Sequence, residues 1–160
     1  MTNIEPVEVT RLRYRPDWIT TLFVGESAPV SGDFFYHDNS ALVRYMQQAI
    51  GDVDGQGFLD RFKARGWYLD DLVLTPVNHL TPKQRKQLCR EAQASLAERI
   101  RAYRPLAIVS LLHRIERDVN AAADMANSDA PRYVVPFPGF GNQRRFLAGM
   151  ARIALALPSS

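Results

Sequence analysis

The segment Trp18–Asn39, WITTLFVGESAPVSGDFFYHDN, decides the fold that we predict for this chain. It begins with a short apolar run, Ile19–Val24, which is typical of a parallel strand buried on both faces. The run stops at Gly25, and a polar loop follows that contains Glu26 and Asp33. Open α/β folds bind their ligands at the carboxyl ends of the strands. This loop is therefore the first place where we expect a functional site.

The polar loop leads through the aromatic residues Phe34, Phe35 and Tyr36 to a helix that is predicted to begin at Ser40 and to run to about Ile50. Further apolar strands are predicted at 67–74, 106–111 and 133–137, and further helices at 58–64, 81–104, 115–127 and from residue 143. Strand and helix thus alternate four times. This alternation predicts an α/β fold, with a parallel sheet covered by helices on both faces.

The clearest helix start in the sequence is at Thr81. Pro82 follows at the first helical position, and Gln84 stands three residues after the threonine, so the segment has the pattern of a capping box with proline at N1. Apolar residues then repeat every four positions as far as Ile100. The pattern predicts one long amphipathic helix that ends at Pro105.

The chain has 160 residues, of which 46% are hydrophobic, and this size predicts one domain over residues 1–160. Residues 1–17 show no clear periodicity, so we expect an N-terminal arm that lies on the domain. The single cysteine, Cys89, excludes an internal disulfide and any metal site with several cysteine ligands, and its place on an apolar helix face predicts a packing role. We expect no metal and no cofactor.

No apolar run approaches the roughly 18 residues of a membrane span, and the N-terminus lacks the apolar core of a signal peptide. We therefore expect a soluble, cytoplasmic, monomeric protein without a membrane partner. The net charge is +3, and basic residues gather in three places, namely 11–15, 83–86 and 144–145. Such clusters bind nucleic acid through its phosphates, although any single cluster is more often a solvated helix face.

The motifs resemble those of the uracil-DNA glycosylase superfamily, particularly its compact bacterial and archaeal branch. Gly25–Pro29 is similar to the Gly-Glu-Ala-Pro-Gly motif that ends the family's first strand, and Gly32–Phe35 is similar to its Gly-x-Pro-Phe segment. The resemblance continues through Tyr68–Asn78, Leu106–Leu111 and Pro136–Arg145. It implies a three-layer α/β/α sandwich with a four-stranded parallel sheet in the order 2-1-3-4.

The sequence also departs from the family's pattern. Phe137 stands where the family has the histidine that stabilises charge on the uracil, and Gly139 stands where it has a serine, while Pro138 and Asn142 match. The four cysteines that hold an iron–sulfur cluster in the related branch are absent. A fold can be kept while its site is rewritten. The alternative to an enzyme is then a family member that binds nucleic acid or a nucleotide without chemistry.

The resemblance implies roles for residues of the first loop. Removing a base from deoxyribose needs a ring on which the flipped base stacks and a carboxylate that positions water or stabilises the sugar cation. Phe35 is the candidate for the ring, or Phe34 if the register slips by one. Glu26 is the first candidate for the carboxylate and Asp33 the second. The alternative roles are core packing for the rings and loop capping for the acids.

The family's asparagine that reads the edge of uracil falls on Asp71, and Asn78 fills the role if the loop threads differently. Burial in an apolar strand raises the pKa of a carboxyl. A protonated Asp71 would donate to a base carbonyl, whereas an ionised one would favour a base with an exocyclic amine. Alternatively, Asp70 or Asp71 caps a backbone group or pairs with an arginine. His79 could supply the charge of the missing histidine, although a lone loop histidine is more often a surface residue.

The loop before the last predicted helix has the composition of a DNA-contacting element. Phe140 is placed to wedge into a base stack, and Asn142, Arg144 and Arg145 stand at the start of a helix whose amides favour phosphate. The alternative for Phe140 is a buried loop anchor. The function that this resemblance implies is hydrolysis of the N-glycosidic bond of a deaminated or damaged base in DNA. A third interpretation, an unrelated nucleotide-binding domain, lacks any Gly-x-Gly-x-x-Gly or Walker motif after a strand.

Overall fold

The computed structural model describes residues 6–29, 31–52 and 56–159. Four strands form one sheet in which every pairing is parallel, and their order is β2-β1-β3-β4. The strands are β1 (Thr21–Gly25), β2 (Trp67–Asp71), β3 (Ala107–Ser110) and β4 (Arg132–Val134). The structure confirms the predicted α/β class, the parallel sheet and the strand order. All residues of β1, β2 and β3 are buried, as their apolar sequences require.

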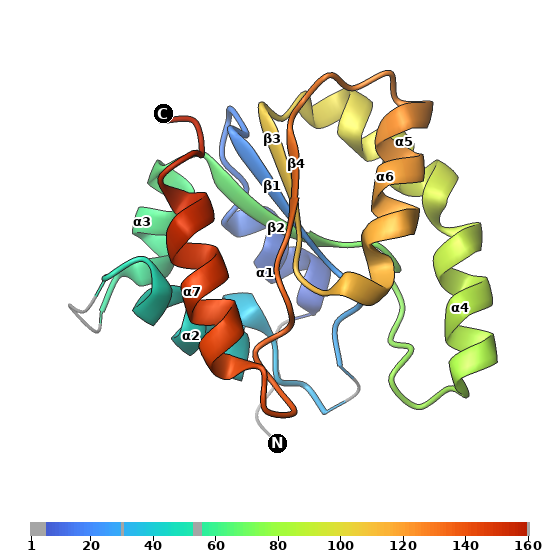
Figure 1. Ribbon diagram of the computed structural model, residues 1–160, viewed down its shortest axis with the longest axis horizontal. Helices are drawn as coiled ribbons and strands as arrows, with labels where there is room; N and C mark the ends of the chain where they lie inside the picture. The colour runs from blue at the N-terminus through green and yellow to red at the C-terminus, as the bar shows by residue number, and fades with distance from the viewer. Residues whose placement is uncertain (1–5, 30, 53–55, 160) are drawn as a thin grey trace.

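Helices form a layer on each face of the sheet (Figure 1). One layer holds α2 (Ala41–Ala49), α3 (Phe58–Ala64) and α7 (Gln143–Ala154), with α2 packed on α7. The other holds α5 (Gln93–Tyr103) and α6 (Glu116–Met125), which pack on each other, while α4 (Pro82–Glu91) extends from α5 past the sheet. Two 3-10 turns, η1 (Phe35–His37) and η2 (His113–Ile115), follow β1 and β3.

The predicted helix starts are confirmed. The Ser40 hydroxyl accepts from the amide of Val43 and caps α2. The Thr81 hydroxyl accepts from the amide of Gln84, whose side chain accepts from the amide of Thr81, so the capping box is complete. The long helix predicted from Thr81 to Pro105 is wrong in one respect, because it is interrupted at Ala92 into α4 and α5.

The last strand is shorter than the predicted run 133–137. Prolines at 136 and 138 have no amide hydrogen to donate to a neighbouring strand, which is consistent with an end of β4 at Val134. The second strand likewise ends at Asp71, although the amides of Leu72 and Val73 still donate to the carbonyls of Gly25 and Glu26.

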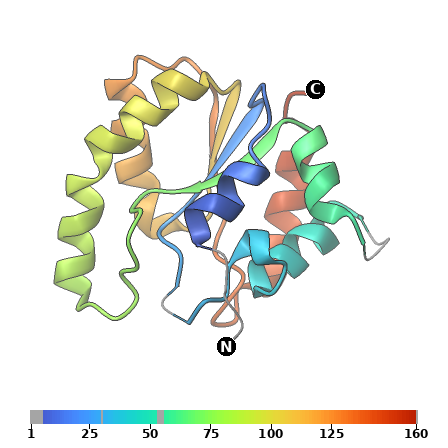
Figure 2. The same ribbon diagram turned by 180° about the vertical axis from the view of Figure 1, so that it is seen from behind.

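The N-terminal arm is the main difference from the predicted fold. Residues 7–13 form a helix, α1 (Val7–Arg13), which lies behind the sheet in Figure 1 and in front of it in Figure 2. Residues 1–5 of the predicted arm lie outside the described residues. The helix is held by Arg11, whose side chain is 2% exposed. A hydrophobic pattern does not reveal this helix, because its principal buried side chains are Thr10 and Arg11.

Candidate functional site at the carboxyl edge of the sheet

Glu26 directly follows β1, at the carboxyl edge of the sheet where the sequence placed it. Its Oε1 accepts from Nη2 of Arg85 on α4 and, at 3.0 Å, from Nη2 of Arg114 in η2. The Glu26 side chain is 10% exposed, that of Arg85 22% and that of Arg114 57%. One carboxylate therefore joins β1, α4 and η2. Local sequence does not indicate that Arg85 and Arg114 contact Glu26, because they lie 59 and 88 residues from it in the chain.

Cys89 lies on the inner side of this cluster. Its Sγ donates to Oε2 of Glu26 at 3.8 Å. Burial, and after it the negative charge of Glu26, raise the pKa of the Cys89 thiol to about 11. The thiol is therefore neutral at physiological pH and weakly nucleophilic. The predicted packing role of Cys89 is confirmed by its burial.

The paired carboxylates of β2 are held by arginines. Nη2 of Arg11 donates to Oδ2 of Asp71 at 2.9 Å, and Arg11 also lies 3.6 Å from Oδ1 of Asp70. Oδ2 of Asp70 is 3.0 Å from Nη1 of Arg99 and accepts from the hydroxyl of Tyr103 at 3.0 Å. This buried network, which we call the Arg11–Asp71 network, consists of Arg11, Asp70, Asp71, Arg99 and Tyr103.

The burial of this network shifts the pKa values of its ionisable groups. Desolvation raises the pKa of Asp71, and the positive charge of Arg11 opposes that shift. For Arg11, burial acts to lower the pKa, but the negative charges of Asp71 and Asp70 outweigh it and the pKa is raised. Burial, and then the charge of Asp70, raise the pKa of Tyr103 to about 12. The predicted alternative of a carboxylate paired with an arginine is the one that the structure shows.

The prediction that Asp71 reads a base edge is corrected by its surroundings. Asp71 is 4% exposed and its Oδ2 is occupied by Arg11. Its Oδ1 faces Gly25, where an added Cβ would lie 2.6 Å from that oxygen. The carboxylate is thus enclosed between α1 and β1 and lacks an open edge for a base. The same contact explains why a glycine ends β1.

Phe34 and Phe35 are core residues in this structure, each 3% exposed. The Phe35 ring packs against Phe58 and Phe62 of α3, with centroids 6.4 and 5.1 Å apart. The Arg11 guanidinium lies over Phe34, 5.1 Å from the ring centroid. The prediction of a stacking face for a flipped base is therefore corrected to core packing, because both rings fill the space between the sheet, α1 and α3.

The remaining candidates of the first two loops are exposed. The amide of Asp33 donates to Oγ of Ser31 at 3.5 Å, in an exposed loop. Asn78 and His79 are exposed in the loop between β2 and α4. None of these three residues is among the contacts of Glu26 with Arg85, Arg114 and Cys89. Asp33, the second candidate for the carboxylate, therefore lies outside the cluster that Glu26, the first candidate, forms with Arg85 and Arg114.

The loop between β4 and α7 presents an aromatic ring to solvent. Phe140 is fully exposed, so the alternative of a buried loop anchor is wrong. Its φ of 52° lies in the left-handed region, which L residues other than glycine rarely adopt. Arg144 and Arg145 are exposed in the first turn of α7, and the side chain of Asn142 does not cap the helix. We call Phe140, Asn142, Arg144 and Arg145 the loop–α7 surface.

A pocket of about 650 Å³ continues from this surface along α7. Its polar lining consists of His113, Asn142, Arg145 and Arg152, and Val134, Pro136 and Gly149 contribute apolar walls. His113 and Arg152 were not among the residues predicted from the sequence. The spacing of 142, 145, 149 and 152 on one helix face is the signal that identifies the α7 side of this pocket.

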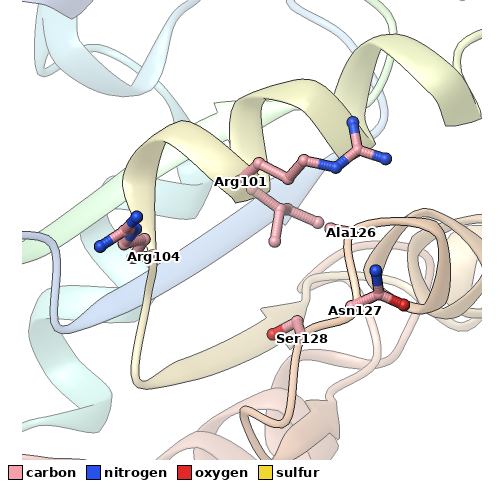
Figure 3. Close-up of a pocket in the computed structure, with 6 residues that line it drawn as sticks. Arg101, Arg104, Ala126, Asn127 and Ser128 are labelled. Carbon is pink, nitrogen blue, oxygen red and sulfur yellow. The ribbon is translucent and has the colours of Figure 1, made fainter.

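A second, smaller pocket of about 360 Å³ lies where α5 and α6 end, at the opposite edge of the sheet. Figure 3 shows that the side chains of Arg101 and Arg104 extend in different directions from it. Nη2 of Arg101 donates to the carbonyl of Met125 at 2.8 Å. Met125 is the last residue of α6, and the carbonyls at a helix end have no partner within the helix. These contacts support a structural role.

Residues 6–29, 31–52 and 56–159 contain no group of three or more His, Cys, Asp or Glu side chains that could hold a metal ion. Within the same part of the chain, no helix is both long and apolar enough to cross a membrane. In comparisons with known proteins, neither a protein-family model nor a curated protein matches this sequence.

Proposed function

We propose that this protein binds nucleic acid through the loop–α7 surface. The observation that carries the proposal is Phe140, a fully exposed ring on a left-handed backbone. Leaving a phenylalanine in water forgoes roughly 1.5–3 kcal/mol of burial, and the backbone conformation costs about 1–2 kcal/mol more. The fold gains nothing from this ring. A base stacked on it would recover about 1–3 kcal/mol.

The charges around Phe140 support the same ligand. In the part of the chain that the structure describes, Arg144 and Arg145 have no hydrogen-bond or ion-pair partner. Unpaired guanidinium groups bind phosphate bidentately and release counterions from nucleic acid. The first amides of α7, a helix of 12 residues, point toward the same place. An exposed aromatic ring four and five residues before two unpaired arginines matches the combination of stacking and positive charge by which proteins bind single-stranded nucleic acid.

The test is the affinity of the protein for a fluorescein-labelled single-stranded oligonucleotide, measured by anisotropy at several salt concentrations. Arg144→Ala with Arg145→Ala is expected to weaken binding about 10-fold and to lower the salt slope by about 1.4, or about 0.7 for each phosphate contact with a single strand. Lys86→Ala with Arg90→Ala removes the same charge from α4, on the other side of the molecule (Figure 1). An equal loss in both double variants would contradict the proposal, since it would indicate attraction by net charge alone.

The variant Phe140→Gly is expected to have opposite effects on the stability of the protein and on its affinity for the oligonucleotide. Glycine adopts positive φ at little cost, so the variant is expected to unfold at a higher urea concentration, with a gain of about 1 kcal/mol. The loss of stacking is expected to weaken oligonucleotide binding about 10-fold. Phe137→Ala, in the same loop, is the matched control. A variant that is less stable than the wild type would show that Phe140 packs on the fold.

A second candidate function is hydrolysis of an N-glycosidic bond, and the position of Glu26 favours it. This carboxylate stands at the carboxyl end of β1 and is 10% exposed, and one of the two arginines that bind it is itself exposed. Such a carboxylate would stabilise the positive charge that develops on the sugar when the base leaves. The resemblance to uracil-DNA glycosylases implies the same role for Glu26. Arg114 would have to move aside for a substrate to reach it.

The measurement for this candidate uses oligonucleotides that carry uracil, hypoxanthine, xanthine or an alkylated base, and detects alkali-labile abasic sites. Cleavage that Glu26→Gln abolishes and Arg114→Met retains would assign the chemistry to the carboxylate. Arg114→Met is the matched control, because it breaks one of the same ion pairs and leaves the carboxylate in place. Binding without cleavage of any substrate would leave nucleic-acid recognition as the function.

A further inference from the structure

We infer that the pocket between α7 and the end of β4 binds one nucleotide of a single strand, with the phosphates on its two sides held by Arg145 and Arg152. This inference deepens the proposed function and rests on it. The pocket adjoins the loop–α7 surface, because Asn142 and Arg145 belong to both. A strand stacked on Phe140 would therefore pass directly into it.

The volume and the walls fit a nucleotide. A volume of about 650 Å³ lies within the range of roughly 300–1,000 Å³ that is typical of small-molecule sites. Val134, Pro136 and Gly149 give the pocket apolar walls against which the base and sugar would pack. At Gly149 an added Cβ would lie 3.4 Å from Cγ1 of Val135, so this part of α7 lies close to the strand end.

Polar side chains line the same pocket. Arg145 and Arg152 are seven residues apart on one helix, so they are separated by about 10 Å along its axis. They are thus placed to bind an anion at each end of the pocket. His113 lies on the pocket wall formed by η2, and Asn142 lies beside Arg145 at the start of α7.

These polar side chains are available. Within the described residues, the side chains of His113, Asn142, Arg145 and Arg152 have no hydrogen-bond or ion-pair partner. The described lining of the pocket also contains no carboxylate. The site therefore offers donors and positive charge without an internal counterion. It should prefer a nucleoside with phosphate on both its 3′ and 5′ sides over one with a single phosphate, and both over a nucleoside.

The first test uses a variant that fills the pocket without changing its charge. Ala148 lines the pocket and is exposed on α7, so Ala148→Trp places an indole in the nucleotide's space. This variant is expected to lose about 10-fold in affinity for a labelled single strand and for deoxythymidine 3′,5′-bisphosphate. Ala151→Trp, which is exposed on the same helix outside the pocket, is the matched control and should bind as the wild type does. Thermal unfolding of both variants checks the fold.

A second variant keeps the pocket open. Arg152→Ala is expected to lower the salt slope of strand binding by about 0.7 and to remove the preference for deoxythymidine 3′,5′-bisphosphate over the 5′-monophosphate. Competition between the bisphosphate and the labelled strand shows whether a free nucleotide and a nucleotide within a strand use the same site.

The outcomes are distinguishable. If Ala148→Trp binds the labelled strand as tightly as the wild type, the pocket inference is overturned and the proposed function remains. If the wild type binds the bisphosphate no better than deoxythymidine, the assignment of two phosphates is overturned. If the wild type binds no oligonucleotide at low salt, both the inference and the proposed function fail.

Discussion

Replacing Arg11 with methionine is expected to lower the free energy of unfolding by about 3–5 kcal/mol, the cost of removing one partner of a buried ion pair. Arg11 is 2% exposed, and it is the group that neutralises Asp71 and donates to the carbonyl of Leu69 at 3.2 Å. Without it, the buried carboxylate of Asp71 loses the guanidinium that pairs with it, since Arg99 donates to the backbone carbonyl of Asp71 and not to its side chain in the contacts of the described residues. Urea denaturation followed by circular dichroism measures the loss.

The size of this loss depends on pH. Burial raises the pKa of Asp71 in the folded protein above its value in the unfolded chain. The folded state therefore holds this proton more tightly, and the stability that the carboxyl contributes falls as pH rises through the interval between the two pKa values. Removing Arg11 extends that interval upward. The difference between wild type and Arg11→Met is expected to be smaller at pH 5 than at pH 8.

Two further variants control this prediction. Glu8→Gln removes the exposed partner of Arg11, at 53% exposure, and should cost less than about 1 kcal/mol. Arg11→Met combined with Asp71→Leu should recover part of the stability, because an apolar pair replaces the lone charge. Equal stability of the double and single variants would contradict this account of Asp71.

Glu26→Gln is expected to lower the free energy of unfolding by about 1.5–3 kcal/mol, as for a hydrogen bond to a charged group. Glutamine keeps the size of the side chain and removes the charge that joins β1, α4 and η2. The loss should come mainly through Arg85, which is 22% exposed, because the more exposed Arg114 is screened by solvent. Urea denaturation at neutral pH gives the value.

The matched control is Arg114→Met, which breaks the exposed half of the same cluster. We expect it to cost less than about 1 kcal/mol. A loss as large as that of Glu26→Gln would show that Arg114, and not Arg85, supports the fold. The comparison also shows whether both variants are folded without urea, which the glycosylase assay needs.

The local signals of the sequence predicted most of the fold. The apolar runs identified all four strands, and their alternation with helices indicated the parallel sheet. Caps at Ser40 and Thr81 depend on side chains within three residues of one another, so their geometry follows from the sequence alone. The order of the strands came from the resemblance, because no local pattern specifies which strands are neighbours.

The site was less accessible to prediction, because its contacts join distant parts of the chain. Arg11 meets Asp71 60 residues away, and Glu26 meets Arg114 88 residues away. A charged residue in an irregular arm is ordinarily exposed, so nothing in the local pattern indicated that Arg11 is buried. Phe34 and Phe35 follow a loop whose sequence is typical of a ligand site. Their rings are nevertheless core residues, because α1 and α3 cover them.

The central position of β1 in the sheet has a consequence for the nascent chain during synthesis. This strand is synthesised first and lies between β2 and β3, which leave the ribosome after it. Until Trp67 and the residues after it have emerged, the backbone edges of this strand have neither β2 nor β3 to pair with. Synthesis thus exposes an unpaired apolar strand that the native protein buries completely. We expect this segment to be where a chaperone would bind the growing chain.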